Sequence, residues 1–306
     1  MPASLVHFTF IKENVDNRDK YFMETALGGQ GPDVFFYCGY SFSKRENTKL
    51  VRDFGTYLHH IDISEIYFKL VDYTNKSKDK EILLPYVRGL LMHYVLDRNV
   101  HPYIFYRSGF VGDGSKKDEF NNLLSHAYFE SGLDNLYSKL HKTLQNPKKC
   151  VKIPNSSLVA ITRMWYWLSK EINYEGIAPD SFIDCYEDMR FAMGFLSSPL
   201  KIKKLFFHLF KRNTLIDALS FPFTNKKAIR EDYLNTSKKE WKNCVTGESR
   251  RESVDELVAN AVKETLEIDD LLNKPSLANM KKFIHGIDHD GFEVDANKKY
   301  FDKVSF

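Results

Sequence analysis

The sequence predicts an all-α protein, a helical bundle followed by a helical C-terminal extension. Apolar residues recur at steps of three and four through most of the chain, which is the spacing of one face of an α-helix. No stretch alternates apolar and polar residues for long enough to indicate a β-strand. Aromatic residues form 14% of the 306 residues, with 24 Phe and 17 Tyr, so the core is expected to consist largely of big side chains.

The composition indicates a soluble, cytoplasmic protein. Apolar residues account for 43% and charged residues for 28%, which is ordinary for a globular domain. The net charge of +3 is too small to indicate nucleic acid or a membrane surface as partner. The N-terminus lacks the basic region of a signal peptide, and no later window is long and apolar enough to span a membrane. The cysteines form no CxxC pair and are expected to be reduced thiols: Cys38, Cys150, Cys185 and Cys244.

The first elements contain two candidate ligands. A helix is predicted over residues 6–15, with His7 at its start. A turn rich in glycine and proline follows and leads through Asp33 into apolar residues. An unpaired acid would be costly to bury there, so Asp33 is expected either to cap a helix or to bind a cation.

Residues 48–73 predict one long amphipathic helix, because their apolar side chains recur at helical steps. His59 and His60 are adjacent in this helix and therefore point in different directions, so at most one is expected to face the core. A polar linker at residues 75–80 separates this helix from the next.

The stretch 85–107 contains the most informative spacing. His93 and Asp97 are four residues apart in an apolar helical run, so their side chains lie one above the other and can bind the same divalent ion. His101 is two turns beyond His93, about 12 Å along the axis. Pro102 disfavours helical geometry at His101, so the chain is expected to turn there. At least two ions are predicted, with Asp97 between them.

A second helix repeats this spacing. Residues 120–144 form a helical pattern in which His126, Glu130 and Asp134 lie at positions i, i+4 and i+8. Two such pairs, about thirty residues apart, favour a metal site over coincidence.

The second half of the chain contains helical patterns but few candidate ligands. Residues 285–295 include His285, Asp288, His289 and Asp290, yet Gly286 interrupts the helix and no EF-hand pattern is complete, so a surface turn is expected. We therefore expect a metal-binding helical core at 1–145 and a helical extension at 146–306 packed on it, or one continuous domain. Helices are predicted at 157–172, 181–197, 200–212 (a basic segment whose lysines are expected to be solvated) and 252–273.

These motifs resemble those of a known family. HYVLDRNVHPYIFY, together with MPASLVHFTF, GPDVFFY, GTYLHH and HAYFES in this order, is similar to the zinc-dependent phospholipase C family, in particular its intracellular bacterial members. That family shares its helical fold with the S1/P1-type nucleases. The resemblance implies that fold for this chain.

The resemblance also implies the ligands of two or three zinc ions. One zinc would be bound by Asp33, His59, His93 and Asp97, a second by His101, His126 and Glu130, and a third by His7, shared with Asp97. His59 follows a Gly-x-x-Leu segment as the family's ligand does, with His60 as the alternative. Secreted members complete the third site with an N-terminal Trp, whereas this sequence begins Met-Pro.

The activity implied by the resemblance is hydrolysis of a phosphate ester by a metal-activated water, with Asp33 as the residue that orients or deprotonates the water. Two alternatives remain open at this point. A single-strand nuclease on the same scaffold would need aromatic surfaces for stacking bases. A metal-stabilised module without catalytic activity would need metal only for folding.

Overall fold

The computed structural model describes residues 4–41, 43, 45–109, 116–143, 146–196 and 226–302. It is 65% helical and 2% strand, so the prediction of an all-α protein is confirmed. The first half contains α1 (Ser4–Asn14), α2 (Phe22–Gly28), the 3₁₀ helix η1 (Gly31–Tyr37), α3 (Thr48–His59), α4 (Ser64–Lys76), α5 (Lys80–Ser108) and α6 (Lys116–Leu140). The second half contains α7 (Pro147–Cys150), α8 (Asn155–Glu171), α9 (Ser181–Leu196), α12 (Lys226–Arg230), β1 (Trp241–Lys242), β2 (Ser249–Arg250), α13 (Val254–Thr265), α14 (Ile268–Asn273) and α15 (Leu277–Ile284).

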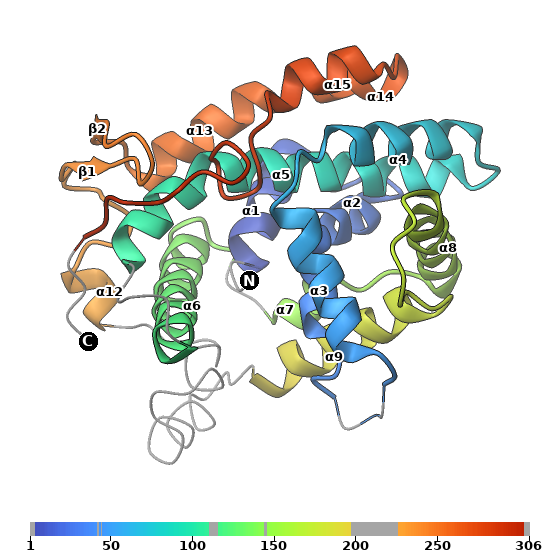
Figure 1. Cartoon of the computed structure of the whole chain (residues 1–306), viewed down its shortest axis with the longest axis horizontal. Helices are drawn as coiled ribbons and strands as arrows, with labels where there is room; N and C mark the ends of the chain where they lie inside the picture. Colours follow the sequence, from blue (N-terminus) through green and yellow to red (C-terminus); the bar gives the residue numbers. More distant parts are fainter. Residues whose placement is uncertain are drawn as a thin grey trace.

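Helix α5 runs through the middle of the molecule, with α13 along one side of it and α2 and α4 on others (Figure 1). It also contacts α6, α8 and α14. Its apolar residues Leu90, Leu91, Tyr94 and Val95 are all fully buried. A helix surrounded in this way has no solvent-facing side in its central turns, so its polar residues must also be buried.

Pro102 does not end this helix, contrary to the expected turn at His101, because α5 continues to Ser108. A proline inside a helix leaves the carbonyl four residues earlier without its amide partner, here that of Arg98. Gly291 packs against this carbonyl, so closely that a Cβ on Gly291 would lie 2.3 Å from Arg98 O. The C-terminal segment therefore packs directly on α5 at Pro102.

Two glycines allow α2 and α5 to cross with their backbones in contact. A Cβ on Gly28 would lie 2.0 Å from Tyr86 O, and a Cβ on Gly89 would lie 2.2 Å from Thr25 O. Only glycine permits such an approach. The crossing brings the end of α2, and η1 directly after it, against the centre of α5.

The predicted helix over 48–73 is in fact two helices, α3 and α4, because the chain turns between them. The Asp62 carboxylate accepts a hydrogen bond from the amide of Ser64 at 3.0 Å, which stabilises the start of α4. Of the apolar side chains of α3, Phe54 and Leu58 are buried but Leu50 and Tyr57 are exposed.

The predicted helix over 252–273 is likewise divided, into α13 and α14. Leu266 is 79% exposed, whereas Ile268, Leu271 and Leu272 just after it are buried. The turn at 266–267 thus directs the apolar residues of α14 toward the core. Helices α8 and α9 agree with the predicted 157–172 and 181–197, and the predicted helix at 200–212 lies outside the described residues.

Buried apolar side chains from both halves of the chain belong to one cluster, which includes Leu5 of α1 and Ile284 of α15. The described strands form one short antiparallel pair, in which Trp241 is opposite Arg250. Among the described residues, no helix is both long and apolar enough to cross a membrane.

Candidate metal centre

Eight buried or partly buried residues form three groups, two of which share His93, and within each group the ligand atoms lie within 4.8 Å of one another. We refer to them together as the metal centre. The His7 group contains His7, His93 and Asp97; the Asp33 group contains Asp33, His59 and His93; the His126 group contains His101, His126 and Glu130. These are the eight residues that the sequence predicted, and such groups could hold metal ions.

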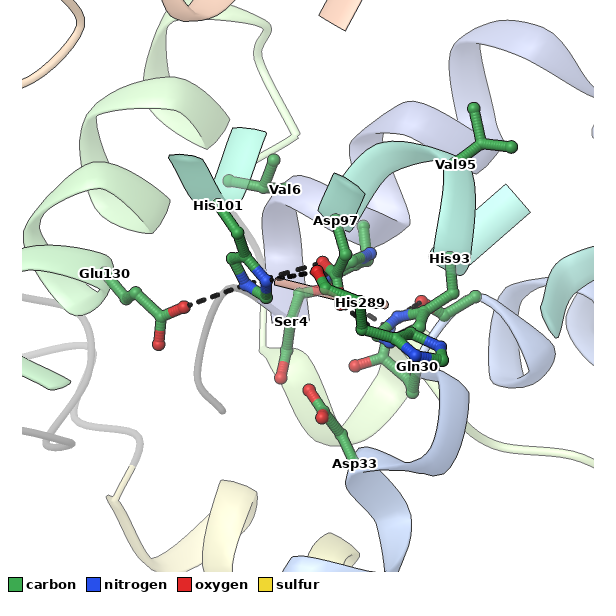
Figure 2. Close-up of polar contacts among 12 residues, drawn as sticks. Ser4, Val6, Gln30, Asp33, His93, Val95, Asp97, His101, Glu130 and His289 are labelled. Carbon is green, nitrogen blue, oxygen red and sulfur yellow. Dashed lines mark hydrogen bonds and ion pairs between the residues drawn. The ribbon is translucent and has the colours of Figure 1, made fainter. Parts of the chain in front are cut away.

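Five elements contribute to the centre. Helix α5 supplies His93, Asp97 and His101 at four-residue steps, and α6 supplies the other i, i+4 pair. The remaining ligands come one each from α1, η1 and α3. Figure 2 shows Asp97 between His93 and His101, with Glu130 on the far side of His101 and Asp33 opposite the helix.

Asp97 links two of the groups. Its Oδ2 is 2.9 Å from His93 Nε2, and its Oδ1 is 3.1 Å from His7 Nε2 and 3.7 Å from His101 Nε2. A single carboxylate therefore faces imidazoles from both ends of the centre. The sequence placed Asp97 between two ions, and this geometry is compatible with that position.

The other contacts have similar lengths. His59 Nε2 lies 3.0 Å from Asp33 Oδ1, while Glu130 Oε1 is 3.1 Å from His126 Nε2 and 3.5 Å from His101 Nε2. Two ligand atoms on a tetrahedral zinc are roughly 3.3 Å apart, because each bond is about 2.0–2.1 Å long. The spacing of the ligand atoms thus suits a shared ion.

The second ring nitrogen of three histidines is held by a backbone carbonyl. Nδ1 of His59 lies 2.7 Å from Gly55 O, and Nδ1 of His93 lies 3.1 Å from Gly29 O. A carbonyl only accepts, so each Nδ1 must donate its hydrogen. His101 makes the same contact at 2.8 Å with the carbonyl of residue 289. Such bonds leave each Nε2 free for a metal.

This arrangement requires a cation. With Nδ1–H committed to a carbonyl, a neutral imidazole presents the lone pair of Nε2 to the carboxylate, and two lone pairs about 3 Å apart repel. Either a proton or a metal ion on Nε2 removes the repulsion. His93 Nε2 has no hydrogen-bond partner among the described residues, although Asp97 is close, so its orientation suits a third atom better than the carboxylate.

Protons on the histidines would supply the cation in the absence of metal. Burial lowers the pKa of His101, but Asp97 and Glu130 outweigh it and raise the pKa to about 10. Burial raises the pKa of Asp97, yet His101, His93 and His7 hold it well below its usual range. The pKa of Glu130 is also held low, against burial, by His126 and His101. The carboxylates are therefore ionised and ready to bind metal.

The backbone is shaped around the His93 ring. Gly31, at the start of η1, has φ +58°, and a Cβ there would lie 2.1 Å from Cδ2 of His93. Only glycine allows both the conformation and the contact. Asp33 follows in the first turn of η1 and faces His59, so the alternative role of Asp33 as a helix cap is not observed.

The segment 285–295 was predicted as a surface turn, and this prediction is wrong for its central residues, although His285, Glu293 and Asp295 are exposed. His289 is completely buried, and Asp288 and Asp290 are 5% and 6% exposed. The His289 ring is 4.8 Å from that of His59 and 5.6 Å from that of His93. Gly286 does interrupt the helix as expected, but the loop folds inward onto the metal centre.

Two other polar candidates lie outside the three groups. His60 points away from the Asp33 group, with a side chain 55% exposed and Nε2 3.7 Å from Asp290. Asp134 accepts hydrogen bonds from the amides of Leu5 and Val6 at 2.9 and 2.7 Å. It therefore caps the start of α1, the helix that carries His7.

Asp33 and His126 are the most exposed ligands, with side chains 18% and 19% accessible, whereas those of His93 and Glu130 are at most 1%. The solvent side of the centre therefore lies at these two residues. Comparisons of the chain with models of protein families, with curated proteins and with solved structures give no match.

Proposed function

We propose that the chain is a zinc-dependent phosphoesterase of the phospholipase C type. The observation that carries the proposal is the set of three ligand groups, in which three of the five histidines, His59, His93 and His101, have Nδ1 bound to a carbonyl and Nε2 close to a carboxylate. Imidazole-rich sites of this composition favour zinc over magnesium or calcium, which prefer oxygen ligands. The order of the sequence motifs, which resembles that family, supports the same choice.

The charge of the centre suits an anionic substrate. It contains three carboxylates, Asp33, Asp97 and Glu130, so two zinc ions would leave a net charge of about +1, from +4 and −3. When bound, zinc would lower the pKa of a water to near neutrality and bind the phosphoryl oxygens. A phosphate ester would approach from the side of Asp33 and His126, where the centre is accessible.

Asp33 is the carboxylate we assign to the attacking water. It is the most exposed of the three acids, and its pKa is lowered, against burial, by the charge of the chain's amino group together with the nearby histidines His59 and His93. An ionised carboxylate at the accessible edge can accept a hydrogen bond from a water and so orient it.

The test combines metal content with hydrolysis. Protein purified without chelator is analysed for zinc, and assayed with bis(4-nitrophenyl) phosphate, phosphatidylcholine micelles and single-stranded DNA. We expect two or three zinc ions per chain and chelator-sensitive hydrolysis. Asp97→Asn should lose zinc and turnover together, Asp33→Asn should lose turnover by 10²-fold or more and no more zinc than the ion of the Asp33 group, and His60→Ala should keep both.

The outcomes separate the alternatives. Hydrolysis of DNA in preference to the lipid would indicate the nuclease. Bound zinc that stabilises the fold, without turnover of any of the three substrates, would indicate a metal-stabilised binding module. Hydrolysis that survives in Asp97→Asn would contradict the ligand assignment.

A further inference from the structure

The C-terminal loop, residues 287–292, makes backbone contacts with two ligands of the metal centre. The carbonyl of His289 accepts the hydrogen bond from His101 Nδ1 at 2.8 Å. The amide of the same residue donates to the carbonyl of His59 at 3.2 Å. One loop residue is thus bonded to ligands from two different groups, and Figure 2 shows His289 beside His93 and Asp97.

The conformation of this loop is set by Asp288. Its Oδ1 accepts hydrogen bonds from the amides of Asp290 at 2.9 Å and Phe292 at 3.2 Å. The amide of Asp288 in turn donates to the carbonyl of Phe292 at 2.8 Å. Gly291 closes the turn with φ +79°, packed on α5 at Arg98. These bonds direct the carbonyl of His289 toward His101.

The side chain of His289 attaches the loop to α4 and α5. The Tyr67 hydroxyl donates to Leu90 O at 3.2 Å and lies 3.1 Å from His289 Nε2. Because the hydroxyl has one hydrogen, His289 Nε2 is the donor to Tyr67, and this bond fixes the orientation of the His289 ring. Burial lowers the pKa of His289 well below the usual range.

We propose that the C-terminal loop is a positioning element of the metal centre, in which the carbonyl of His289 sets the tautomer and orientation of His101 as a ligand of the His126 group. This inference rests on the metal binding proposed above. The other two histidines with fixed tautomers depend on carbonyls of α2 and α3, outside the loop. Disturbing the loop should therefore lower the affinity of the His126 group for its ion and leave the ion of the Asp33 group in place.

The test uses two variants of one residue. Asp288→Ala removes the acceptor for both loop amides, whereas Asp288→Asn retains an Oδ1 that can accept them. We expect Asp288→Ala to lose one ion per chain by elemental analysis, with 10–100-fold weaker affinity at that site, which is the usual effect of outer-shell partners. Asp288→Asn should keep wild-type metal content.

A glycine pair provides an independent comparison in the same loop. Gly291→Ala would place a Cβ 2.3 Å from Arg98 O, whereas Gly286→Ala, also at positive φ (+70°), meets nothing within 4 Å. We expect the first variant to lose the same ion as Asp288→Ala and the second to retain it. The visible spectrum of the Co²⁺-substituted protein should show the change confined to one of its sites.

The results distinguish this inference from the proposed function. Wild-type metal affinity and an unchanged Co²⁺ spectrum in both Asp288→Ala and Gly291→Ala would overturn the role of the loop while leaving the centre intact. Equal loss at all sites in Asp288→Ala would also overturn it, since the loop would then act on overall folding. A wild-type protein that binds no metal would instead refute the centre itself.

Discussion

His93 belongs to two of the three groups, which allows the division of the metal centre to be tested by stability. His93→Ala should remove a ligand from both the His7 group and the Asp33 group. His59→Ala should affect only the Asp33 group, and His126→Ala only the third. The measured quantity is the rise in melting temperature caused by zinc, not the melting temperature itself, because His93→Ala also leaves a cavity in metal-free protein.

The expected shifts follow from mass action. A ligand at 100 times its Kd stabilises the folded state by about 2.7 kcal/mol for each site. In a chain of this size 1 kcal/mol raises the melting temperature by about 2 °C, so each ion should contribute about 5 °C. His59→Ala and His126→Ala should each lose about 5 °C of the zinc-induced shift. His93→Ala should retain only the contribution of the His126 group, about 5 °C.

Differential scanning fluorimetry at fixed free zinc, with and without chelator, gives these shifts. His60→Ala is the matched control, because His60 is adjacent to His59 but has a side chain 55% exposed and outside the groups; it should retain the full shift. The reasoning is refuted if His93→Ala keeps as large a shift as His126→Ala. It is equally refuted if His60→Ala loses as much as His59→Ala.

Three further predictions concern the fold around the centre. Asp134→Ala should destabilise the metal-free protein by about 1–3 kcal/mol, because the amides of Leu5 and Val6 lose their acceptor. A midpoint of urea unfolding as high as that of the wild type would contradict this capping role. Gly28→Ala should destabilise the protein by about 1–3 kcal/mol because its Cβ would overlap Tyr86 O. The control Gly194→Ala should be neutral or stabilising, because its Cβ meets only the Lys148 side chain. Similar effects of the two variants would disprove the close crossing of α2 and α5. The pKa of His101 is about 10 in the metal-free fold and about 6.5 when unfolded. Protonation of His101 therefore stabilises the folded state fully below pH 6.5, and this stabilisation is lost as pH rises toward 10. The free energy of unfolding of metal-free protein, measured in urea, should therefore fall between pH 7 and 9, and more steeply than that of His101→Gln. An equal fall in the two proteins would show that His101 is uncharged.

Local spacing was sufficient to predict most of the centre. His93 and Asp97, like His126 and Glu130, are one turn apart, so any helix places each pair on one face. Whether the pairs meet depends on how α5 packs against α6, which spacing does not reveal. The resemblance supplied the order of the ligands, and the structure brings those residues together.

The C-terminal loop could not be predicted in the same way. His289 is almost two hundred residues from His93, and a Gly-containing HGIDHDG segment usually forms an exposed turn. The loop packs on α5 through Gly291 and Pro102, and the effect of Pro102 on the helix was also predicted wrongly. A contact between residues so far apart in the sequence leaves no local pattern. The break before α4 was missed because the helical spacing of apolar residues continues across it, whereas the bond from the amide of Ser64 to Asp62 is a detail of the turn.

The burial of these ionisable residues argues for a role other than stability. Transfer of charges into a core costs several kcal/mol for each ion, and replacing buried charge clusters by apolar residues is often neutral or stabilising. Helix α5 nevertheless carries His93, Asp97 and His101 through its most buried turns. Protons on the histidines compensate for this only in part, since the pKa of His7 is lowered by burial and by His93, so the imidazoles compete for positive charge. Metal ions would satisfy all of the imidazoles at once. A triple variant with apolar residues at His101, His126 and Glu130 should therefore fold at least as stably as the metal-free wild type. If it is much less stable, the cluster contributes to folding through its own ion pairs, and the case for a metal centre loses its energetic basis.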